Sequence, residues 1–284
     1  MGQSAVIGTV KDLRAQVRAW RGEGLRVALV PTMGALHEGH LSLCRIGLSH
    51  AHRLIVSIFV NPKQFAPAED FAAYPRPFEA DVARLATVHT HAVFAPTPEE
   101  MYPNGFATSV RVDGPAQNLE ANSRPTHFEG VATVVAKLLL QAQPDVAVFG
   151  EKDYQQLQVI RRMVADLDLP VEIRAGPTLR EPDGLAMSSR NVYLSPAERR
   201  IAPRLHQTLQ AAAFALRDGA NPEDAVAAAK ATLEQCGFQV DYVEFRDTAN
   251  LAPIDTLTRS ARLLVAARLG RTRLIDNVPV EPHR

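Results

Sequence analysis

The chain of 284 residues is longer than most single domains, so we expect one large α/β domain or two unequal domains. Hydrophobic residues make up 46% of the chain and charged residues 22%, close to the averages of soluble globular proteins. This composition excludes a disordered chain and a small disulfide-stapled protein. Lysine plus arginine and aspartate plus glutamate each number 31, so no net charge attracts nucleic acid or anionic lipid. Any anionic ligand must therefore be held by a local site.

The cysteines and the apolar segments indicate where the protein resides. Cys44 and Cys236 lie far apart and lack the neighbours that a zinc site or a disulfide framework would need, so reduced thiols are expected. No run of about 18 apolar residues occurs, and the first residues carry neither a signal-peptide pattern nor a myristoylation signal. The sequence predicts a cytoplasmic protein with no membrane and no nucleic-acid partner.

The first third of the chain predicts a βαβ unit. Residues 9–20 have helical spacing, and the apolar segment that begins at Leu25 reads as a buried strand. A helical pattern from Glu38 to His50 precedes a second buried strand from Leu54 to Val60. A right-handed crossover makes these strands parallel neighbours, and α/β sheets bind ligands at the carboxyl ends of such strands.

Helices and strands continue to alternate up to residue 176. A segment with four prolines, from Pro62 to Pro77, suits a shaped loop over a site and is a candidate lid. Beyond it the patterns predict a doubly wound, Rossmann-like parallel sheet. The expected helices are residues 78–86, 130–141 and 154–167, and the expected strands are residues 91–96, 108–112, 145–150 and 171–175.

The composition changes after Gly176, which predicts a domain of residues 1–176 and a smaller α+β domain of residues 177–284. Residues 196–217 and 222–235 are alanine-rich and helical in pattern, the second with Asn221 as N-cap and Pro222 at the first helical position. Three strand-like runs follow, at residues 239–245, 261–269 and 272–278.

The segment PTMGALHEGH carries the first candidate site. His37 and His40 stand three apart at a helix start, hence on one face, where the helix dipole already favours phosphate. Two imidazoles there can donate hydrogen bonds to phosphoryl oxygens as charge builds. Met33 lies in the strand-to-helix turn, and Gly34 and Gly39 let a backbone or a flat base approach closely. The alternatives are a capped helix with two surface histidines, or zinc, for which further ligands are missing locally.

Two more segments at strand ends suit phosphate. In FGEKDYQQ, Lys152 could reach a phosphate and Asp153 a ribose hydroxyl, although a solvated helix start explains the same residues. In REPDGLAMSSRN, Ser188, Ser189 and Arg190 follow a turn and could form a mobile clamp on polyphosphate, although a plain loop is the simpler explanation for this segment alone. Three such segments at successive strand ends favour a nucleotide site.

Five motifs in order resemble the pantothenate synthetase (pantoate–β-alanine ligase) family. They are PTMGALHEGH, SIFVNPKQF, RPTHFEGVATVV, FGEKDYQQLQVI and REPDGLAMSSRNVYLS. The resemblance is dense from about Leu25 to Ser195 and looser beyond. It makes HEGH the HxGH element of a nucleotidyltransferase superfamily that includes class I aminoacyl-tRNA synthetases, and MSSRN its KMSKS-type counterpart.

The resemblance implies an AMP-forming acid–amine ligase. Its substrates would be pantoate, β-alanine and ATP, its intermediate a pantoyl adenylate, and its products pantothenate, AMP and pyrophosphate. His40 would be the catalytic proton donor, assisted electrostatically by His37, Lys152 and Arg190. Gln64 and Gln156 would bind pantoate. ATP would be held by Met33, Gly34, Gly39, Gly150, Asp153, backbone near Leu179, Met187, Ser188 and Ser189.

The metal, the assembly and two rival functions complete the expectations. Lys63 stands where many relatives have methionine, and Ala80 and Arg84 replace residues near magnesium in some relatives, so Mg²⁺ is expected chiefly on the ATP phosphates, with Asp81 as the candidate protein ligand. Relatives are commonly homodimers. A nucleotidyltransferase of the same fold acting on a phosphorylated acceptor, or a non-catalytic nucleotide-binding module, would carry the same HxGH element.

Overall fold

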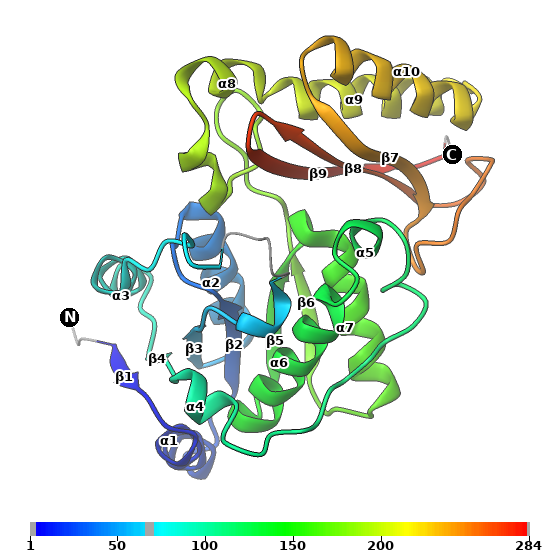
Figure 1. The fold of residues 1–284 in the computed structure, drawn as a ribbon. Coiled ribbons are helices and arrows are strands. Elements are labelled where there is room, and N and C mark those ends of the chain that lie inside the picture. The colour runs from blue at the N-terminus through cyan, green and yellow to red at the C-terminus, as the bar shows by residue number, and fades with distance from the viewer. Residues whose placement is uncertain (1–3, 66–70, 283–284) are drawn as a thin grey trace.

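A parallel six-stranded sheet forms the N-terminal part of the computed structural model, which describes residues 4–65 and 71–282 (Figure 1). Its strand order is β1-β4-β3-β2-β5-β6, and every neighbouring pair is parallel. The strands are β1 (Ala5–Ile7), β2 (Val27–Thr32), β3 (Arg53–Ile58), β4 (Ala92–Phe94), β5 (Val146–Gly150) and β6 (Glu172–Gly176). The predicted Rossmann-like doubly wound sheet is confirmed.

Alternating side chains of the buried strands serve two cores, one on each face of the sheet. Val27 and Leu29 point into a core with α1 (Val10–Gly22), α6 (His127–Ala142) and α7 (Tyr154–Asp166). Ala28 and Val30 point into the opposite core with α2 (Glu38–His50) and α3 (Phe78–Ala86). Helices therefore cover both faces, which explains why the strands read as continuous apolar runs.

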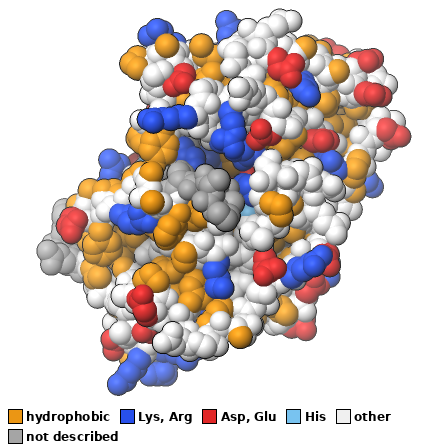
Figure 2. Space-filling model, in the orientation of Figure 1, with side chains coloured by type: hydrophobic (Ala, Val, Ile, Leu, Met, Phe, Trp, Pro, Cys, Tyr) orange, Lys and Arg blue, Asp and Glu red, His pale blue; other side chains and the backbone are white. Residues whose placement is uncertain are grey.

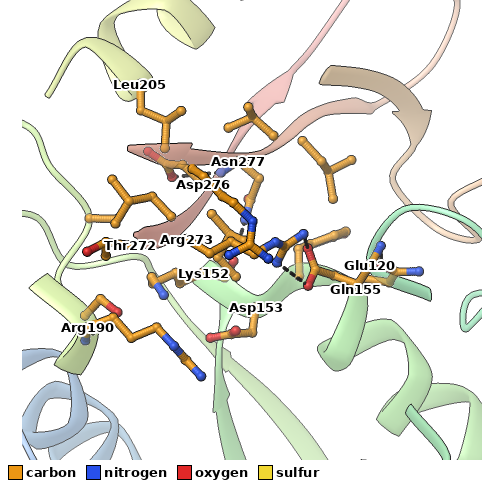
Figure 3. Close-up of a pocket in the computed structure, with 18 of the residues that line it drawn as sticks. Glu120, Lys152, Asp153, Gln155, Arg190, Leu205, Thr272, Arg273, Asp276 and Asn277 are labelled. Carbon is orange, nitrogen blue, oxygen red and sulfur yellow. Dashed lines mark hydrogen bonds and ion pairs between the residues drawn. The ribbon is translucent and has the colours of Figure 1, made fainter. Parts of the chain in front are cut away.

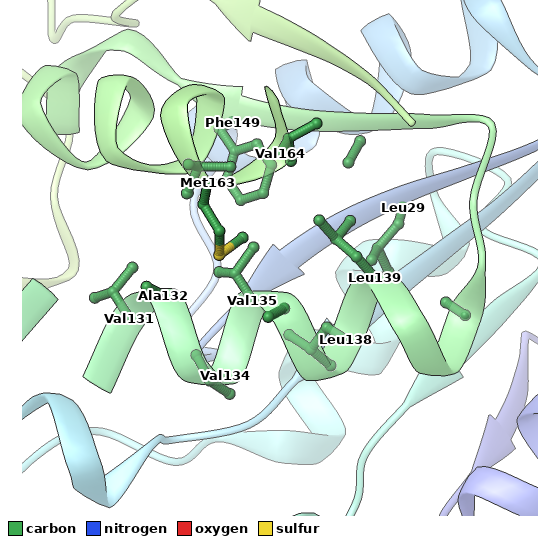
Figure 4. Close-up of a cluster of buried hydrophobic side chains, with 14 of the residues drawn as sticks. Leu29, Val131, Ala132, Val134, Val135, Leu138, Leu139, Phe149, Met163 and Val164 are labelled. Atoms are coloured by element: carbon green, nitrogen blue, oxygen red, sulfur yellow. The ribbon is translucent and has the colours of Figure 1, made fainter. Parts of the chain in front are cut away.

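Helix α6 has the most buried residues of the helices that cover the sheet. Figure 4 shows its apolar side chains, among them Val131, Val135 and Leu139, packed against strand residues and against the Met163 and Val164 side chains of α7. Each fully buried aliphatic side chain contributes roughly 1.5–3 kcal/mol. The helix that borders the site at its first turns is thus anchored over its whole length.

The strand order reverses between β2 and β5. From β2 the chain proceeds through β3 to β4 on one side, whereas β5 and β6 lie on the other side. Loops that leave the carboxyl ends of β2 and β5 therefore diverge, and open sheets bind ligands in the crevice at such a point. The loop after β2 leads into α2, and the loop after β5 forms the 3₁₀ turn η2 (Glu151–Asp153).

The C-terminal part is an antiparallel sheet of order β7-β8-β9, covered on one face by helices. In Figure 1 it lies above the parallel sheet. Its elements are α8 (Pro196–Ile201), α9 (Arg204–Arg217), α10 (Pro222–Gln235), β7 (Gln239–Asp247), β8 (Ala261–Leu269) and β9 (Thr272–Val280). The smaller α+β unit is confirmed, while the division at residue 176 stays a prediction.

Two predictions about elements were wrong, and one strand was missed. Residues 108–112 form no strand, because the Val110 N–H donates to Thr133 Oγ1 of α6 instead of a neighbouring strand. The helix expected over residues 196–217 is split into α8 and α9, since Pro203 lacks the N–H that would continue it. Strand β1 was missed because it is three residues long and pairs at the edge of the sheet.

The predicted lid lies partly outside the described residues, at positions 66–70. Its described beginning is a short 3₁₀ helix, η1 (Pro62–Gln64), and not irregular chain. Three further short elements are α4 (Pro98–Met101), α5 (Glu120–Ser123) and η3 (Ser189–Tyr193). None of the helices in the described part of the chain has the length and apolar character needed to traverse a bilayer.

Candidate active site

One cleft lies between the carboxyl ends of the parallel strands and the C-terminal sheet. It has an inner cavity of about 230 Å³ and an outer cavity of about 420 Å³. The two share lining residues: Arg124, His127, Lys152, Asp153, Gln156, Ser188 and Arg190. Figure 2 shows Lys and Arg side chains gathered where the N-terminal and C-terminal parts meet. The cleft is therefore placed and charged to hold an anion.

Most of the site residues predicted from the sequence line the inner cavity. Its lining includes Met33, His37, Gly39, His40, Gln64, Gly150, Lys152, Asp153, Gln156, Leu179, Met187, Ser188, Ser189 and Arg190. These come from five separate segments of the chain. Two predicted residues, Gly34 and Asp81, are not among the described residues that line it.

The two histidines form the cap of helix α2. His37 is the N-cap residue, and its Nδ1 accepts from the Gly39 N–H at 3.2 Å. His40 Nδ1 accepts from the His37 N–H, also at 3.2 Å, and so closes a capping box usually made with Ser or Thr and Glu. The ring centroids lie 4.1 Å apart. Because each Nδ1 accepts from a backbone N–H, each ring is left with Nε2 as its N–H donor.

Burial and neighbouring charge keep both rings neutral near pH 7. Burial, followed by the positive charge of Lys152, lowers the pKa of His37 to about 4. Burial, followed by His37, lowers the pKa of His40 to about 3. His40, which the resemblance makes the catalytic proton donor, is therefore neutral near pH 7 and offers its Nε2–H as a hydrogen-bond donor.

The depressed pKa values predict an acid-sensitive fold. Between pH 6.5 and about 3 the unfolded state binds protons that His40 in the folded state does not, so stability falls as the pH falls through this window. His40→Gln keeps an acceptor for the His37 N–H and removes the titration. We expect the melting temperature of the wild type, minus that of this variant, to decrease from pH 7.5 to 4.5 in thermal unfolding of the ligand-free protein. A melting-temperature difference that stays constant with pH would contradict the lowered pKa of His40.

Close packing holds the start of α2 against the MSSRN segment. A Cβ on Gly39 would lie 2.9 Å from the His37 ring and 3.9 Å from the Met187 Cβ. Ser189 Oγ donates to the Ala35 carbonyl oxygen at 3.0 Å. The two elements that the resemblance pairs therefore touch, and the Arg190 guanidinium lies 5.9 Å from the centre of the Tyr74 ring.

Lys152 is held from the opposite wall of the cleft. Asn277 of β9 donates through Nδ2 to the carbonyl oxygens of Glu151 and Lys152, each at 2.9 Å. Figure 3 shows Lys152, Asp153 and Arg190 below Asp276 and Asn277. The C-terminal sheet thus positions the turn that carries the predicted phosphate-binding lysine.

A buried ion pair also joins the two walls. Arg273 of β9 donates to both carboxylate oxygens of Glu120, at 2.7 and 2.9 Å (Figure 3). Tyr242 donates to the same carboxylate at 2.8 Å. Burial acts to raise the pKa of Glu120, but Arg273, Tyr242 and Arg124 together outweigh it, and the pKa lies below its ordinary value. Removing one partner of such a pair leaves a buried charge, so the pair fastens the walls together.

Asp81 and Gly34 shape the turn before α2. The Asp81 carboxylate accepts from the N–H groups of Ala35 and Leu36, both at 2.8 Å, and so pins the turn before α2. Gly34 has a φ of +82°, and a Cβ there would lie 3.0 Å from Asp81 Oδ2. Across the described residues, no group of three or more His, Cys, Asp or Glu could hold a metal ion. The geometry favours Asp81 as a support of the turn over a magnesium ligand.

The two predicted pantoate-binding glutamines lie in the same cavity. Gln64, at the end of η1, is buried, and its backbone carbonyl oxygen accepts from His127 Nδ1 at 2.9 Å and Arg124 at 3.2 Å. Gln156, in the first turn of α7, lines both cavities. The structure therefore brings together side chains from the ends of two different strands.

Several polar residues of the cleft were missed from the sequence. Asn61, Arg124 and His127 line the inner cavity, and Tyr102 contacts it through Asn61. The first three stand inside the recognised motifs NPKQF and RPTHFEG. The motifs therefore pointed to these residues, but the sequence analysis gave them no role. Tyr102 lies in a Pro- and Gly-rich loop, where no pattern identifies it.

The fold and cleft define an α/β protein with a Rossmann-like sheet and a polar ligand site at its switch point. A family model described as Pantoate-beta-alanine ligase matches residues 5–279. Pantothenate synthetases from Paramagnetospirillum magneticum and Caulobacter vibrioides are 59% and 57% identical over 278 and 284 residues, covering 98% and 99% of this chain and 98% and 100% of theirs. The chain belongs to the pantoate–β-alanine ligase family and is a ligase of pantothenate biosynthesis.

Solved structures agree with this assignment. The pantothenate synthetase of Thermus thermophilus matches with a TM-score of 0.92 and 46% identity, covering 98% of this chain and 100% of that one. The pantoate-beta-alanine ligase of Francisella tularensis, complexed with beta-gamma ATP and beta-alanine, matches with a TM-score of 0.80 and 32% identity, covering 97% of each chain. The likeness extends over both the parallel sheet and the C-terminal sheet.

Proposed function

We propose that the protein condenses pantoate with β-alanine, using ATP, through a pantoyl-adenylate intermediate, and releases AMP and pyrophosphate. The observation that carries the proposal is the inner cavity, where a neutral histidine pair, Lys152, the MSSRN clamp and two glutamines converge at the switch point. Family membership and the ATP and β-alanine complex of the Francisella relative support the same substrates.

Adenylation suits these parts because a carboxylate is a poor acyl donor. Transfer of AMP to the pantoate carboxylate provides a good leaving group, and negative charge grows on the α-phosphoryl group and on pyrophosphate. The Nε2–H groups of His37 and His40 and the cations of Lys152 and Arg190 are the donors for that charge. Bound phosphate would itself raise the pKa of each imidazole, which strengthens these hydrogen bonds.

Neutral amides are suited to hold the attacking acid. A cationic clamp on the pantoate carboxylate would reduce its nucleophilicity, whereas Gln64 and Gln156 can bind oxygens and leave one carboxylate oxygen free. Both amides line the inner cavity together with the histidine pair. The acid and the α-phosphorus can therefore be held side by side.

Magnesium does not fit a protein-held site among the described residues. Asp81, its candidate ligand, accepts two backbone N–H groups, and no cluster of three metal-binding side chains occurs in the described ranges. We therefore assign no step to a protein-bound ion. Mg²⁺ that enters on the ATP phosphates remains compatible with the cleft.

A homodimer and a cytoplasmic location complete the proposal. The homodimer follows from the resemblance to the family, in which homodimers are common. The cytoplasmic location follows from the reduced thiols expected of Cys44 and Cys236, and it is consistent with the family. Light scattering coupled to size-exclusion chromatography of the purified protein measures the assembly directly.

Pantoate-dependent exchange of pyrophosphate into ATP, measured without β-alanine, tests the mechanism. We expect exchange only when pantoate is present, and AMP with pyrophosphate as the products once β-alanine is added. ADP with phosphate would mean acyl-phosphate chemistry. A product that retains the nucleotide would indicate a nucleotidyltransferase, and ATP binding without turnover would indicate a binding module.

A further inference from the structure

We propose that Tyr102 is a positioning residue: acting through Asn61, it fixes the Gln64 amide with its N–H groups toward the inner cavity, so that this position accepts only an oxygen of the acid substrate. The inference rests on the proposed function. Tyr102 lies outside all the recognised motifs. Its proposed role determines whether the pantoate site offers donors or acceptors of hydrogen bonds at Gln64.

Two backbone groups fix the orientation of the Asn61 side chain. The Lys63 N–H, which can only donate, lies 3.3 Å from Asn61 Oδ1. The Gly130 carbonyl oxygen, which can only accept, lies 3.1 Å from Asn61 Nδ2. These main-chain partners identify the oxygen and the nitrogen of the Asn61 amide, and Asn61 itself is 1% exposed.

The Asn61 side chain in turn orients Gln64. Asn61 Nδ2 has a second hydrogen, and it donates to Gln64 Oε1 at 3.1 Å. The Gln64 oxygen is thereby engaged, and its Nε2 is left as the free end of the amide, without a hydrogen-bond partner among the described residues. Since Gln64 lines the inner cavity, the group offered to a ligand is a pair of N–H donors.

Tyr102 closes the chain from the far side. Its hydroxyl lies 2.8 Å from Asn61 Oδ1, an acceptor, so the tyrosine must donate. Burial raises the pKa of Tyr102, which keeps this donor protonated. The Lys63 ammonium lies 5.2 Å from the centre of the Tyr102 ring, and the centres of the Tyr102 and Phe106 rings lie 5.0 Å apart. These contacts hold the Tyr102 ring in place.

The consequence is a selectivity rule for the ligand. Two N–H donors bind a carboxylate, hydroxyl or carbonyl oxygen and repel an ammonium group. Pantoate can meet these donors with any of its oxygens, whereas β-alanine can meet them only through its carboxylate and not through its amine. The fixed amide therefore excludes the β-alanine amine from this position.

A double-mutant cycle in the pyrophosphate-exchange assay tests the inference. Tyr102→Phe keeps the ring and removes the donor, and we expect kcat/KM for pantoate to fall roughly tenfold, with KM for ATP within about twofold. Gln64→Met removes the amide and should cost roughly 10- to 100-fold. In the Gln64→Met background, Tyr102→Phe should cost nothing more, because its effect passes through the missing amide.

Two further variants sharpen the result. Asn61→Asp places an acceptor beside Gln64 Oε1 and forces that amide to turn, so the loss for pantoate should exceed that of Tyr102→Phe. Thr133→Val is the control: it removes the hydrogen bond from the Val110 N–H to Thr133 Oγ1 of α6, which lies outside the cleft. This variant should leave the kinetics for pantoate unchanged.

The possible failures are distinguishable. Wild-type kinetics in Tyr102→Phe, or losses that multiply in the double variant, would overturn the role of Tyr102 while leaving the proposed function standing. A wild-type protein without pantoate-dependent exchange would overturn the proposed function and this inference with it.

Discussion

His40→Ala is expected to lower kcat of the pantoate-dependent exchange by roughly 10²-fold or more, with a much smaller rise in KM for ATP. The reason is geometric. His40 stands in the first turn of α2, its Nδ1 is engaged by a backbone N–H, and its Nε2–H is free to follow the charge that develops on the phosphoryl group. A contact that strengthens in the transition state acts on kcat.

The control must separate loss of the donor from loss of the helix cap. His40→Gln retains an oxygen acceptor for the His37 N–H, so its helix start should survive while the imidazole donor is gone. Ser42→Ala removes only the bond from Ser42 Oγ to the Gly39 carbonyl oxygen in the same turn, and should change kcat little. If His40→Ala kept the wild-type kcat, the histidine would act as a cap alone.

Local patterns explain how much of the fold could be predicted. Helix α2 was predicted from Glu38 to His50, and the structure has the same bounds, because apolar periodicity and the histidine cap agree. Strand β8 was likewise predicted at its observed bounds, Ala261–Leu269. The segment 108–112 failed for the opposite reason: its alternating side chains pack onto the core, but its backbone bonds a side chain of α6.

The candidate site could be predicted where a motif carries the chemistry within a few residues. His37, His40, Lys152 and Arg190 were found this way, and they meet in one cavity. Tyr102 could not be found, since its partner Asn61 lies 41 positions away and only the fold brings the hydroxyl to the amide. For Asp81 the resemblance implied a magnesium ligand, whereas the structure shows its carboxylate accepting two backbone N–H groups, a contact that no sequence pattern identifies.

Gly130→Ala is expected to reduce kcat/KM for pantoate by about 10²-fold, although the same change in an open helix would stabilise it. A Cβ at this position would lie 2.2 Å from the Lys63 carbonyl oxygen and 2.7 Å from the Gln64 nitrogen. These are backbone atoms, so no side chain can rotate away. Because α6 is anchored along its length, η1 must move, and Gln64 moves with it.

Stability and kinetics together test this account of Gly130. We expect a loss of about 1–3 kcal/mol in the free energy of unfolding from the overpacking, measured by urea denaturation beside the exchange assay. Gly22→Ala makes the same replacement at the end of α1, where nothing lies within 4 Å of the added Cβ, and should leave pantoate kinetics unchanged. Pantoate kinetics within a few fold of wild type in Gly130→Ala would mean that η1 tolerates the displacement, and that close contact with α6 is not what places Gln64.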